Sequence, residues 1–397
     1  MEDFADIIAS QIEEFSDVIV KDRRYIHARP EIGFETKNTE TYIRSILIKE
    51  GIEILPSTIG VVAKISAPDN VDDYIALRAD IDAIHVEEQN QVEYKSLTKG
   101  TMHACGHDAH TAMLLGAARV INRNRSALQN SILLIFQPAA EGPLGGGARV
   151  LLEDFEKMGL LSNIQAIAAL HMNSELKSGK VGIKYETVLG SLDDFDVEII
   201  GKGGHGGWPH KAKDALAMGV KFVYEMESFM SRGVDPLDPA VFAVGTFHAG
   251  DSRNTIAESV SISGTVRAQS EETRERICEG ARRLLKGLSV YSNTECRIDI
   301  RKGVPALVNN DEKVMQAEII AKMALGNDKV EVMKKAAMGA DDFAIFAQTI
   351  PAAFIWLGTF NPAKNCTEIM HSPKFNIDED VLPTGALLLC HIAFAMK

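Results

Sequence analysis

The sequence predicts an α/β fold in which a smaller α+β domain is inserted into a larger α/β domain. Apolar strand-like runs alternate with helical patterns over residues 1–188 and 304–397, which indicates a largely parallel sheet covered on both faces. Between these segments the order becomes βαββαβ, the order of a ferredoxin-like unit. The length of 397 residues is also more than one typical domain needs.

The larger domain is expected to begin with alternating helices and strands. Apolar positions at helical spacing predict the helices, and short β-branched apolar runs predict the strands. Arg29-Pro30 ends the first helix, and Asp108 is expected to cap the third. These patterns predict helices at 3–26, 37–50, 109–121 and 148–158, and strands at 61–65, 74–79, 131–136 and 164–170.

The pattern changes near residue 190 and changes back after Gly303. Between these points it predicts strands at 193–200, 240–246, 260–267 and 296–301, and helices at 213–231 and 271–290. Beyond them it predicts a helix at 311–324, a strand at 353–357 and a closing helix from about residue 380. We therefore expect the larger domain over residues 1–188 and 304–397, and the inserted domain over 189–303.

Composition excludes several classes of protein. Lys and Arg number 42 against 55 Asp and Glu, and the net charge of −13 repels phosphate backbones, so we expect no nucleic-acid partner. The five cysteines are widely spaced and contain no CxxC, which argues against a disulfide framework or a Cys-rich zinc finger. The acidic start and the lack of a long apolar run predict no membrane partner and a cytoplasmic protein.

The densest polar cluster is the segment 102–110, MHACGHDAH. Cys105 and His107 lie two residues apart, so in extended backbone both side chains face one side and can reach one ion. Thiolate and imidazole are natural ligands of zinc-like divalent metals. The alternative is a polar loop that caps a helix. His103 and His110 could contact metal, or could support the ligands or the helix cap.

Glu141 and His171 extend this hypothesis, because each follows a predicted strand. Ligands of open α/β sheets gather outside the carboxyl ends of the strands. Taken singly, Glu141 could be a surface carboxylate and His171 a hydrogen-bonded core histidine. His371, in the loop after the last predicted strand, is a weaker candidate on spacing alone.

Six motifs occur in order along the chain: RADIDA at 78–83, HACGHD at 103–108, FQPA at 136–139, GGH at 203–205, DDF at 341–343 and HS at 371–372. Together they resemble the M20 metallopeptidase superfamily over about residues 25–390. The closest match is its amidohydrolase branch of aminoacylases, hippurate hydrolases and indole-acetyl-amino-acid hydrolases. The resemblance implies a metal-bearing α/β catalytic domain with an inserted ferredoxin-like lid, through which the chain forms a homodimer or a higher oligomer.

The resemblance also implies a site for two divalent metal ions, with Zn, Mn, Co and Ni all suited to the ligands. Cys105 would bridge the ions, and His107, Glu141, His171 and His371 would complete the ligand set. Asp80 stands where related branches have a histidine ligand and is not counted. Asp82 is expected to orient a ligand.

The lid is expected to supply three further site residues. By the resemblance, His205 stabilises the oxyanion of a substrate bound to the other subunit, and Asn254 and Arg267 contact the substrate carboxylate. The alternatives are a flexible glycine turn around His205 and a solvated strand residue at Arg267. The glycines at 203–207 do not form a phosphate loop, because the GxxxxGK[ST] pattern is absent.

One position departs from the family. The general base there is the first of two adjacent glutamates in FQPAEE, whereas residues 136–141 read FQPAAE. The ligand Glu141 is kept, but the base position holds Ala140, whose methyl group accepts no proton. Loss of a general base typically costs about 10²–10⁴-fold in rate.

Ala140 leaves three interpretations open. The one we favour is an inactive substrate-trapping variant, because the other site positions are intact. The second is a natural pseudoenzyme that binds metal and ligand without turnover. The third is that Asp108 or an external base replaces the glutamate.

The sequence therefore predicts a metal-dependent amidohydrolase for N-acyl amino acids or dipeptide-like amides that carry a free carboxylate. A non-catalytic receptor for the same ligands is the alternative. A purely structural dimeric scaffold would leave His205, Asn254 and Arg267 without a role.

Overall fold

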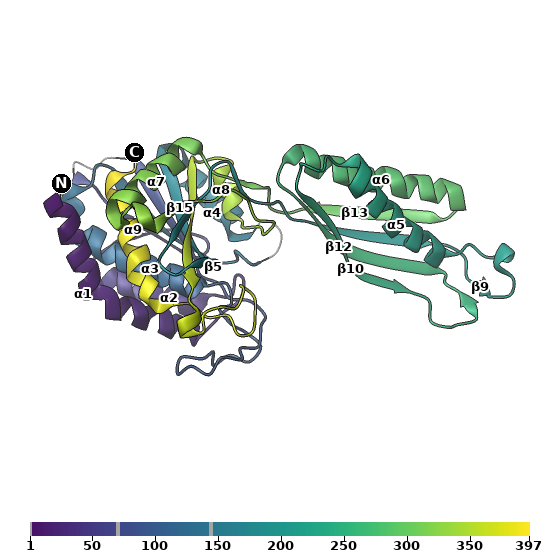
Figure 1. The fold of residues 1–397 in the computed structure, drawn as a ribbon, viewed down its shortest axis with the longest axis horizontal. Coiled ribbons are helices and arrows are strands. Elements are labelled where there is room, and N and C mark those ends of the chain that lie inside the picture. The colour runs from purple at the N-terminus through teal and green to yellow at the C-terminus, as the bar shows by residue number, and fades with distance from the viewer. Residues whose placement is uncertain (1, 69–71, 143–145) are drawn as a thin grey trace. The chain divides into compact units, whose positions relative to one another are not determined.

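The computed structural model of the chain describes residues 2–68, 72–142 and 146–397, and it divides into two compact units (Figure 1). The first unit comprises Met1–Val188, Val308–Lys335 and Asp341–Lys397. The second comprises Leu189–Leu307 and the short segment Ala336–Ala340, which the sequence placed in the larger domain.

Within the described residues, the first unit is built on an eight-stranded mixed sheet in the order β1-β2-β4-β3-β5-β16-β6-β15. Strands β4, β3, β5 and β16 run parallel to one another, whereas β2 and β6 flank them antiparallel. All seven residues of β3 and of β4 are buried, so both faces of the sheet are covered. The strands are β1 Glu53–Leu55, β2 Val61–Ile65, β3 Tyr74–Asp80, β4 Ser131–Gln137, β5 Ile164–Lys177, β6 Val181–Ile183, β15 Val330–Val332 and β16 Ala352–Phe360.

Helices cover this sheet. The apolar helix α3 packs against α1, α9 and β3, while α4 packs against α8 and β4. The helices are α1 Glu2–His27, α2 Lys37–Lys49, α3 His107–Arg123, α4 Gly146–Lys157, α7 Asp311–Leu325, α8 Phe343–Ala347 and α9 Leu382–Ala395. No helix in the described part of the chain is both long and apolar enough to cross a membrane.

Two local predictions in this unit are wrong. Helix α3 begins at His107 after Gly106, whose φ of 90° needs a glycine, and no side chain caps it, so Asp108 is not the cap. Strand β5 continues to Lys177 instead of ending at Leu170, because β16 pairs with it along most of this length. His171 therefore lies within the strand.

Residues 189–307 form a four-stranded antiparallel sheet in the order β10-β12-β8-β13, with α5 and α6 together on one side (Figure 1). Alternate residues of β8, Phe195, Val197 and Ile199, pack into the core beneath these helices. The predicted βαββαβ order is confirmed. The elements are β8 Asp193–Ile200, α5 Ala215–Gly233, β10 Ala240–Ala249, β12 Ser259–Ala268, α6 Glu271–Ser292 and β13 Glu295–Lys302.

A small two-stranded sheet forms beyond one end of the four-stranded sheet. It joins β9 (Gly204–His205) to β11 (Thr255–Ile256) and pairs His205 with Thr255. Two further short strands, β7 (Thr187–Leu189) and β14 (Leu307–Val308), lie where the chain enters and leaves the second unit.

Candidate metal centre

Side chains from separate segments of the first unit converge where β3 and β4 end. Their nitrogen, oxygen and sulfur atoms form two groups, in each of which the atoms lie within 4.8 Å of one another. One group contains Asp80, His107, His110 and His171, and the other contains Cys105, Glu141 and His371. All five ligands expected from the sequence are therefore brought together.

The ligand atoms are oriented by hydrogen bonds at the far side of each residue. The Nδ1 of His171 donates to the carbonyl of Met172 at 2.9 Å, which leaves Nε2 facing the Cys105 sulfur at 3.8 Å. His371 has a φ of 68° and donates its backbone N–H to Ala104 at 2.8 Å. This turn places its Nε2 3.2 Å from Oε1 of Glu141.

The electrostatics of the site favour anionic donors. Burial raises the pKa of the Cys105 thiol, but His107 and His171 together lower it to about 7. Burial likewise opposes ionisation of Glu141, but His371 and His107 lower its pKa to about 2. A thiolate, carboxylates and imidazoles within reach of one another are the donors that borderline divalent metals take, so the two groups fit two divalent metal ions.

Asp82 contacts two segments of this site. Its Oδ1 accepts the backbone N–H of Ala140 and its Oδ2 that of Glu141, both at 3.0 Å. Oδ1 also lies 3.4 Å from Nδ1 of His107. One buried carboxylate thus contacts the backbone of Glu141 and the ring of His107, two of the expected ligands.

Asp80 lies in the first group, although the sequence argument did not count it as a ligand. Its carboxylate accepts from Arg78 Nη1 at 2.7 Å and from His110 Nδ1 at 2.5 Å, and it lies 3.5 Å from Nε2 of His107. His110 Nε2 accepts the backbone N–H of Met172 at 2.9 Å. Both nitrogens of His110 are therefore engaged, so this residue supports the site and has no lone pair free for metal.

His103 and Asp108 belong to neither of the two groups. The buried His103 ring lies 6.3 Å from the ring of His27, and neither of its nitrogens has a hydrogen-bond partner in the described part of the chain. Asp108 lies 2.7 Å from Arg23 Nε and 2.7 Å from His27 Nδ1. Burial opposes ionisation of Asp108, yet Arg23 and His27 hold its pKa well below the usual range. Such a carboxylate is a poor proton acceptor.

The two aspartates of the DDF motif, Asp341 and Asp342, take part in a buried hydrogen-bond network with residues at the ends of β3 and β4. Arg78 Nη2 donates to Asp341 at 3.2 Å and to Asp342 at 3.0 Å, and Gln137 donates to Asp342 at 2.7 Å. Asp342 also accepts the backbone N–H of Ala148 at 3.0 Å, in the first turn of α4. This buried network joins β3, β4, α4 and the start of α8, so it holds the ends of the strands that carry the site.

The three lid residues separate into two places on the second unit. The backbone N–H of Gly206 donates to the carbonyl of Asn254 at 2.8 Å, so His205 and Asn254 share one tip. Arg267 lies at the other end of β12, where its Nη1 donates to the Met338 carbonyl at 3.1 Å. Ser259 at the tip end and Arg267 are eight residues apart, or about 27 Å along a strand.

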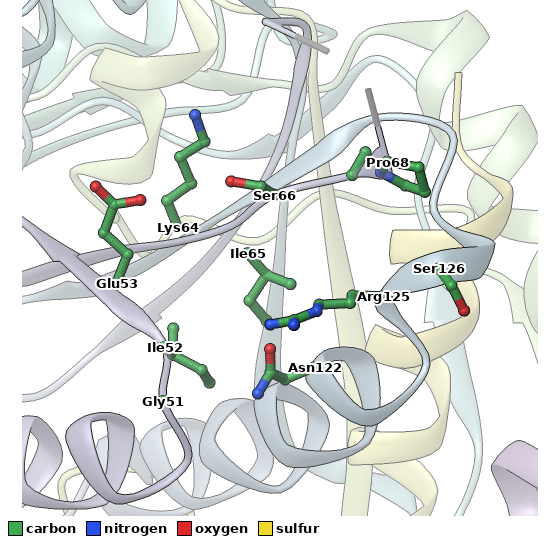
Figure 2. A pocket seen from close by; sticks show the side chains of 11 residues that line it. Gly51, Ile52, Glu53, Lys64, Ile65, Ser66, Pro68, Asn122, Arg125 and Ser126 are labelled. Atoms are coloured by element: carbon green, nitrogen blue, oxygen red, sulfur yellow. The ribbon is translucent and has the colours of Figure 1, made fainter. Parts of the chain in front are cut away.

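A cavity of about 440 Å³ lies elsewhere on the first unit. Figure 2 shows side chains that line it, among them Glu53 of β1, Lys64 of β2 and Asn122 at the end of α3. None of the expected ligands lines it. The metal centre and this cavity are therefore separate features.

The family model for Peptidase family M20/M25/M40 matches residues 76–395. The chain belongs to this family. The resemblance predicted from the motifs is thereby confirmed.

Relatives of this M20 chain include proteins with different named activities. Thermostable carboxypeptidase 2 of Saccharolobus solfataricus is 34% identical over 100% of this chain and 99% of its own length. N-acetylcysteine deacetylase of Bacillus subtilis is 34% identical over 96% of this chain and 97% of its own. IAA-amino acid hydrolase ILR1-like 4 of Arabidopsis thaliana is 34% identical, with coverages of 96% and 86%.

Solved structures agree with this M20 assignment. A putative aminohydrolase from methicillin-resistant Staphylococcus aureus superposes with a TM-score of 0.88 at 31% identity, covering 98% of each chain. The YXEP protein of Bacillus subtilis, described as a dinuclear metal-binding peptidase of the M20 family, superposes with a TM-score of 0.81 at 31% identity, covering 96% of this chain and 98% of its own.

Proposed function

We propose that this chain has the site of a binuclear amidohydrolase (aminoacylase) that cleaves N-acyl amino acids or similar small amides bearing a carboxylate. The observation that carries the proposal is the convergence of Cys105, His107, Glu141, His171 and His371 at one edge of the sheet. The printed names of two relatives, a deacetylase of N-acetylcysteine and a hydrolase of IAA-amino acids, support the substrate class.

The protein's own residues would prepare the reaction. When bound, two divalent ions would lower the pKa of a water to about 7 and polarise the scissile carbonyl. Cys105, His107, Glu141, His171 and His371 would hold these ions. Asp82 keeps His107 and Glu141 in place through the contacts that fix the 140–141 backbone.

The proton-transfer step is missing from this chain. Ala140 keeps its backbone contact with Asp82, so the loop holds its position while the side chain offers no acceptor. Asp108 does not replace it, because its carboxylate is engaged by Arg23 and His27. We therefore propose that the chain binds substrate without turning it over, as a substrate-trapping variant, with a natural pseudoenzyme as the alternative.

The lid residues support a homodimer. His205 would stabilise the oxyanion, and Asn254 and Arg267 would hold the substrate carboxylate. The scissile carbonyl and the carboxylate of an N-acyl amino acid lie only a few ångströms apart, whereas the two lid places are about 27 Å apart along β12, so we propose that one chain does not bring both ends of its lid to one substrate. Two chains can, if each lends His205 and Asn254 to the other.

The second unit also has a surface suited to pairing. Strand β10 lies at the edge of the four-stranded sheet. On α5, the exposed side chains of Leu216, Val220 and Tyr224 recur at intervals of four residues and form an apolar stripe. We propose that this edge and stripe form the dimer interface.

We further propose that the protein works in the cytoplasm. All five cysteines are free, and Cys105 is buried in the ligand group. A metal-ligating thiolate is lost on oxidation, so a reducing compartment keeps this site intact.

The experiment compares the chain with Ala140→Glu. Both proteins are loaded with Zn, Mn, Co or Ni, their metal content is measured, and they are assayed against a panel of N-acyl amino acids. We expect about two ions per chain in both, binding of substrate by both, and turnover about 10²–10⁴-fold higher in Ala140→Glu.

Two results would tell against parts of this proposal. Binding without any gain in turnover in metal-loaded Ala140→Glu would favour the non-catalytic receptor. Failure of both proteins to retain metal, or to bind any member of the panel, would contradict the amidohydrolase site itself.

A further inference from the structure

An exposed aromatic side chain stands beside His205 at the tip of the second unit. Trp208 follows β9 and leaves 56% of its surface exposed. Trp is usually well covered in a folded chain, since its ring offers a large apolar surface. The proposed reaction gives this ring no role.

The ring is fixed relative to His205. The backbone N–H of Trp208 donates to the carbonyl of His205 at 2.8 Å, which closes a tight turn. The two rings lie 4.8 Å apart between centroids with an interplanar angle of 36°. Gly206 permits the turn, because a Cβ there would lie 2.9 Å from the carbonyl oxygen of Asn254. A ligand that contacts the His205 imidazole therefore lies close to the Trp208 indole as well.

A cationic side chain lies beside this ring. Lys211 Nζ lies 5.2 Å from the centre of the Trp208 ring, and the backbone N–H of Lys211 donates to the Trp208 carbonyl at 3.0 Å. Arg253 precedes Asn254 in the adjacent loop. Within the described residues neither Lys211 nor Arg253 is in an ion pair, although the whole chain carries a net charge of −13. The tip therefore combines an aromatic face with positive charge, which suits an anion that carries an apolar group.

We propose that Trp208 is a specificity-determining residue that packs against the acyl group of the substrate and favours aromatic over small acyl groups. This inference rests on the proposed function, because it follows the role of His205 at the scissile carbonyl. The acyl substituent is bonded to that carbonyl carbon, so it lies within a few ångströms of the oxyanion. An indole ring held 4.8 Å from the imidazole is placed to contact it.

The test measures binding, so it does not depend on turnover. The metal-loaded full chain is titrated calorimetrically with N-benzoylglycine and with N-acetylglycine. Trp208→Ala should weaken binding of the benzoyl ligand about 10- to 100-fold and of the acetyl ligand less than about threefold, since only the larger group loses an aromatic contact. Trp208→Phe should restore most of the benzoyl affinity.

A matched control is Tyr291→Ala. Tyr291 lies in α6 of the same unit, is 72% exposed and has Lys221 Nζ 4.6 Å from its ring centre, so it resembles Trp208 in exposure and charge. It takes no part in the proposed site, and its removal should leave both affinities unchanged. Emission gives a second readout, because the chain has two tryptophans and the other, Trp356, is 5% exposed. The benzoyl ligand should change the emission of the chain more than that of Trp208→Phe, in which the remaining Trp356 lies 5.5 Å from the His171 ring.

The outcomes separate the inference from the function on which it rests. If neither ligand binds the metal-loaded chain, the proposed function fails and the inference fails with it. If both ligands bind but Trp208→Ala affects them equally or not at all, only the role of Trp208 is overturned. Equal weakening together with loss of the dimer in sedimentation would assign the ring to the subunit interface instead.

Discussion

The most direct test of how the metal centre is assembled is the substitution Asp82→Asn. Asp82 is buried, and its two oxygens accept the N–H groups of Ala140 and Glu141 at 3.0 Å. An asparagine has one acceptor oxygen and one NH₂ group. Whichever way the amide turns, its NH₂ must face one of these backbone donors, so the loop that carries Glu141 is pushed out of place.

The expected effect has two parts. A hydrogen bond to a charged group is worth about 1.5–3 kcal/mol, so the free energy of unfolding should fall by about that amount. Substitution of a residue that orients a metal ligand typically lowers metal affinity about 10- to 100-fold. Because Asp82 supports both Glu141 and His107, we expect the loss of affinity at the upper end of that range.

The assay is competition for metal against a coloured chelator, with denaturant unfolding of the same samples. Asp154→Asn is the matched control. Asp154 is also buried and accepts two hydrogen bonds, from the backbone N–H of Thr58 at 2.6 Å and from its hydroxyl at 2.7 Å, but it belongs to neither ligand group. Asp154→Asn should lose stability and keep its metal affinity. The reasoning is refuted if Asp82→Asn does the same.

Two further predictions concern the dimer and the pH dependence of stability. Val220→Asp, on the exposed stripe of α5, should yield monomers in sedimentation, whereas Val290→Asp on α6 should not; a dimer in both cases would exclude the stripe as the interface. Burial opposes ionisation of Asp378, but hydrogen bonds from Lys364 and Ser178 lower its pKa from 3.8 to about 2. Its ionised form is thus favoured in the folded state, so its stabilising contribution is complete above about pH 4 and is lost as the pH falls through about 2. Asp378→Asn should be less stable than the parent chain at pH 7 and equally stable near pH 2, and a constant difference in denaturant unfolding across this range would contradict the assignment.

Most elements could be predicted because their patterns are local. The run 61–65 is mostly apolar and bounded by turn residues, and β2 has these same limits. Residues 193–200 alternate between core and outer face, and β8 spans that range. The failures occur where distant segments decide the outcome. Strand β5 extends to Lys177 because β16 pairs with it, and a pairing with residues 352–360 leaves no mark on the sequence of β5.

The expected metal ligands were predicted from motifs, but of the residues that support them only Asp82 was given that role in advance. His110 lies in the same short polar segment as Cys105, but only the contacts of its two nitrogens with Asp80 and Met172 show that it supports the site. Asp80 could have been found as the residue that ends β3, since side chains at the carboxyl ends of parallel strands face the site. The partners of Asp108 on α1 are about 80 residues away in sequence and could not be inferred from it.

The sequence by itself determined the kind of chemistry this protein carries, because residue types and their order fix which donors exist and that Ala140 lacks an acceptor. It also determined most helices and strands, whose periodicity is a property of neighbouring residues. Only the tertiary structure decided which polar side chains lie at the metal centre and which, like Asp108, are paired with other charged residues. It also placed His205 and Arg267 at opposite ends of the second unit. Those distinctions depend on distances of a few ångströms between residues far apart in the chain, and chain folding alone sets these distances.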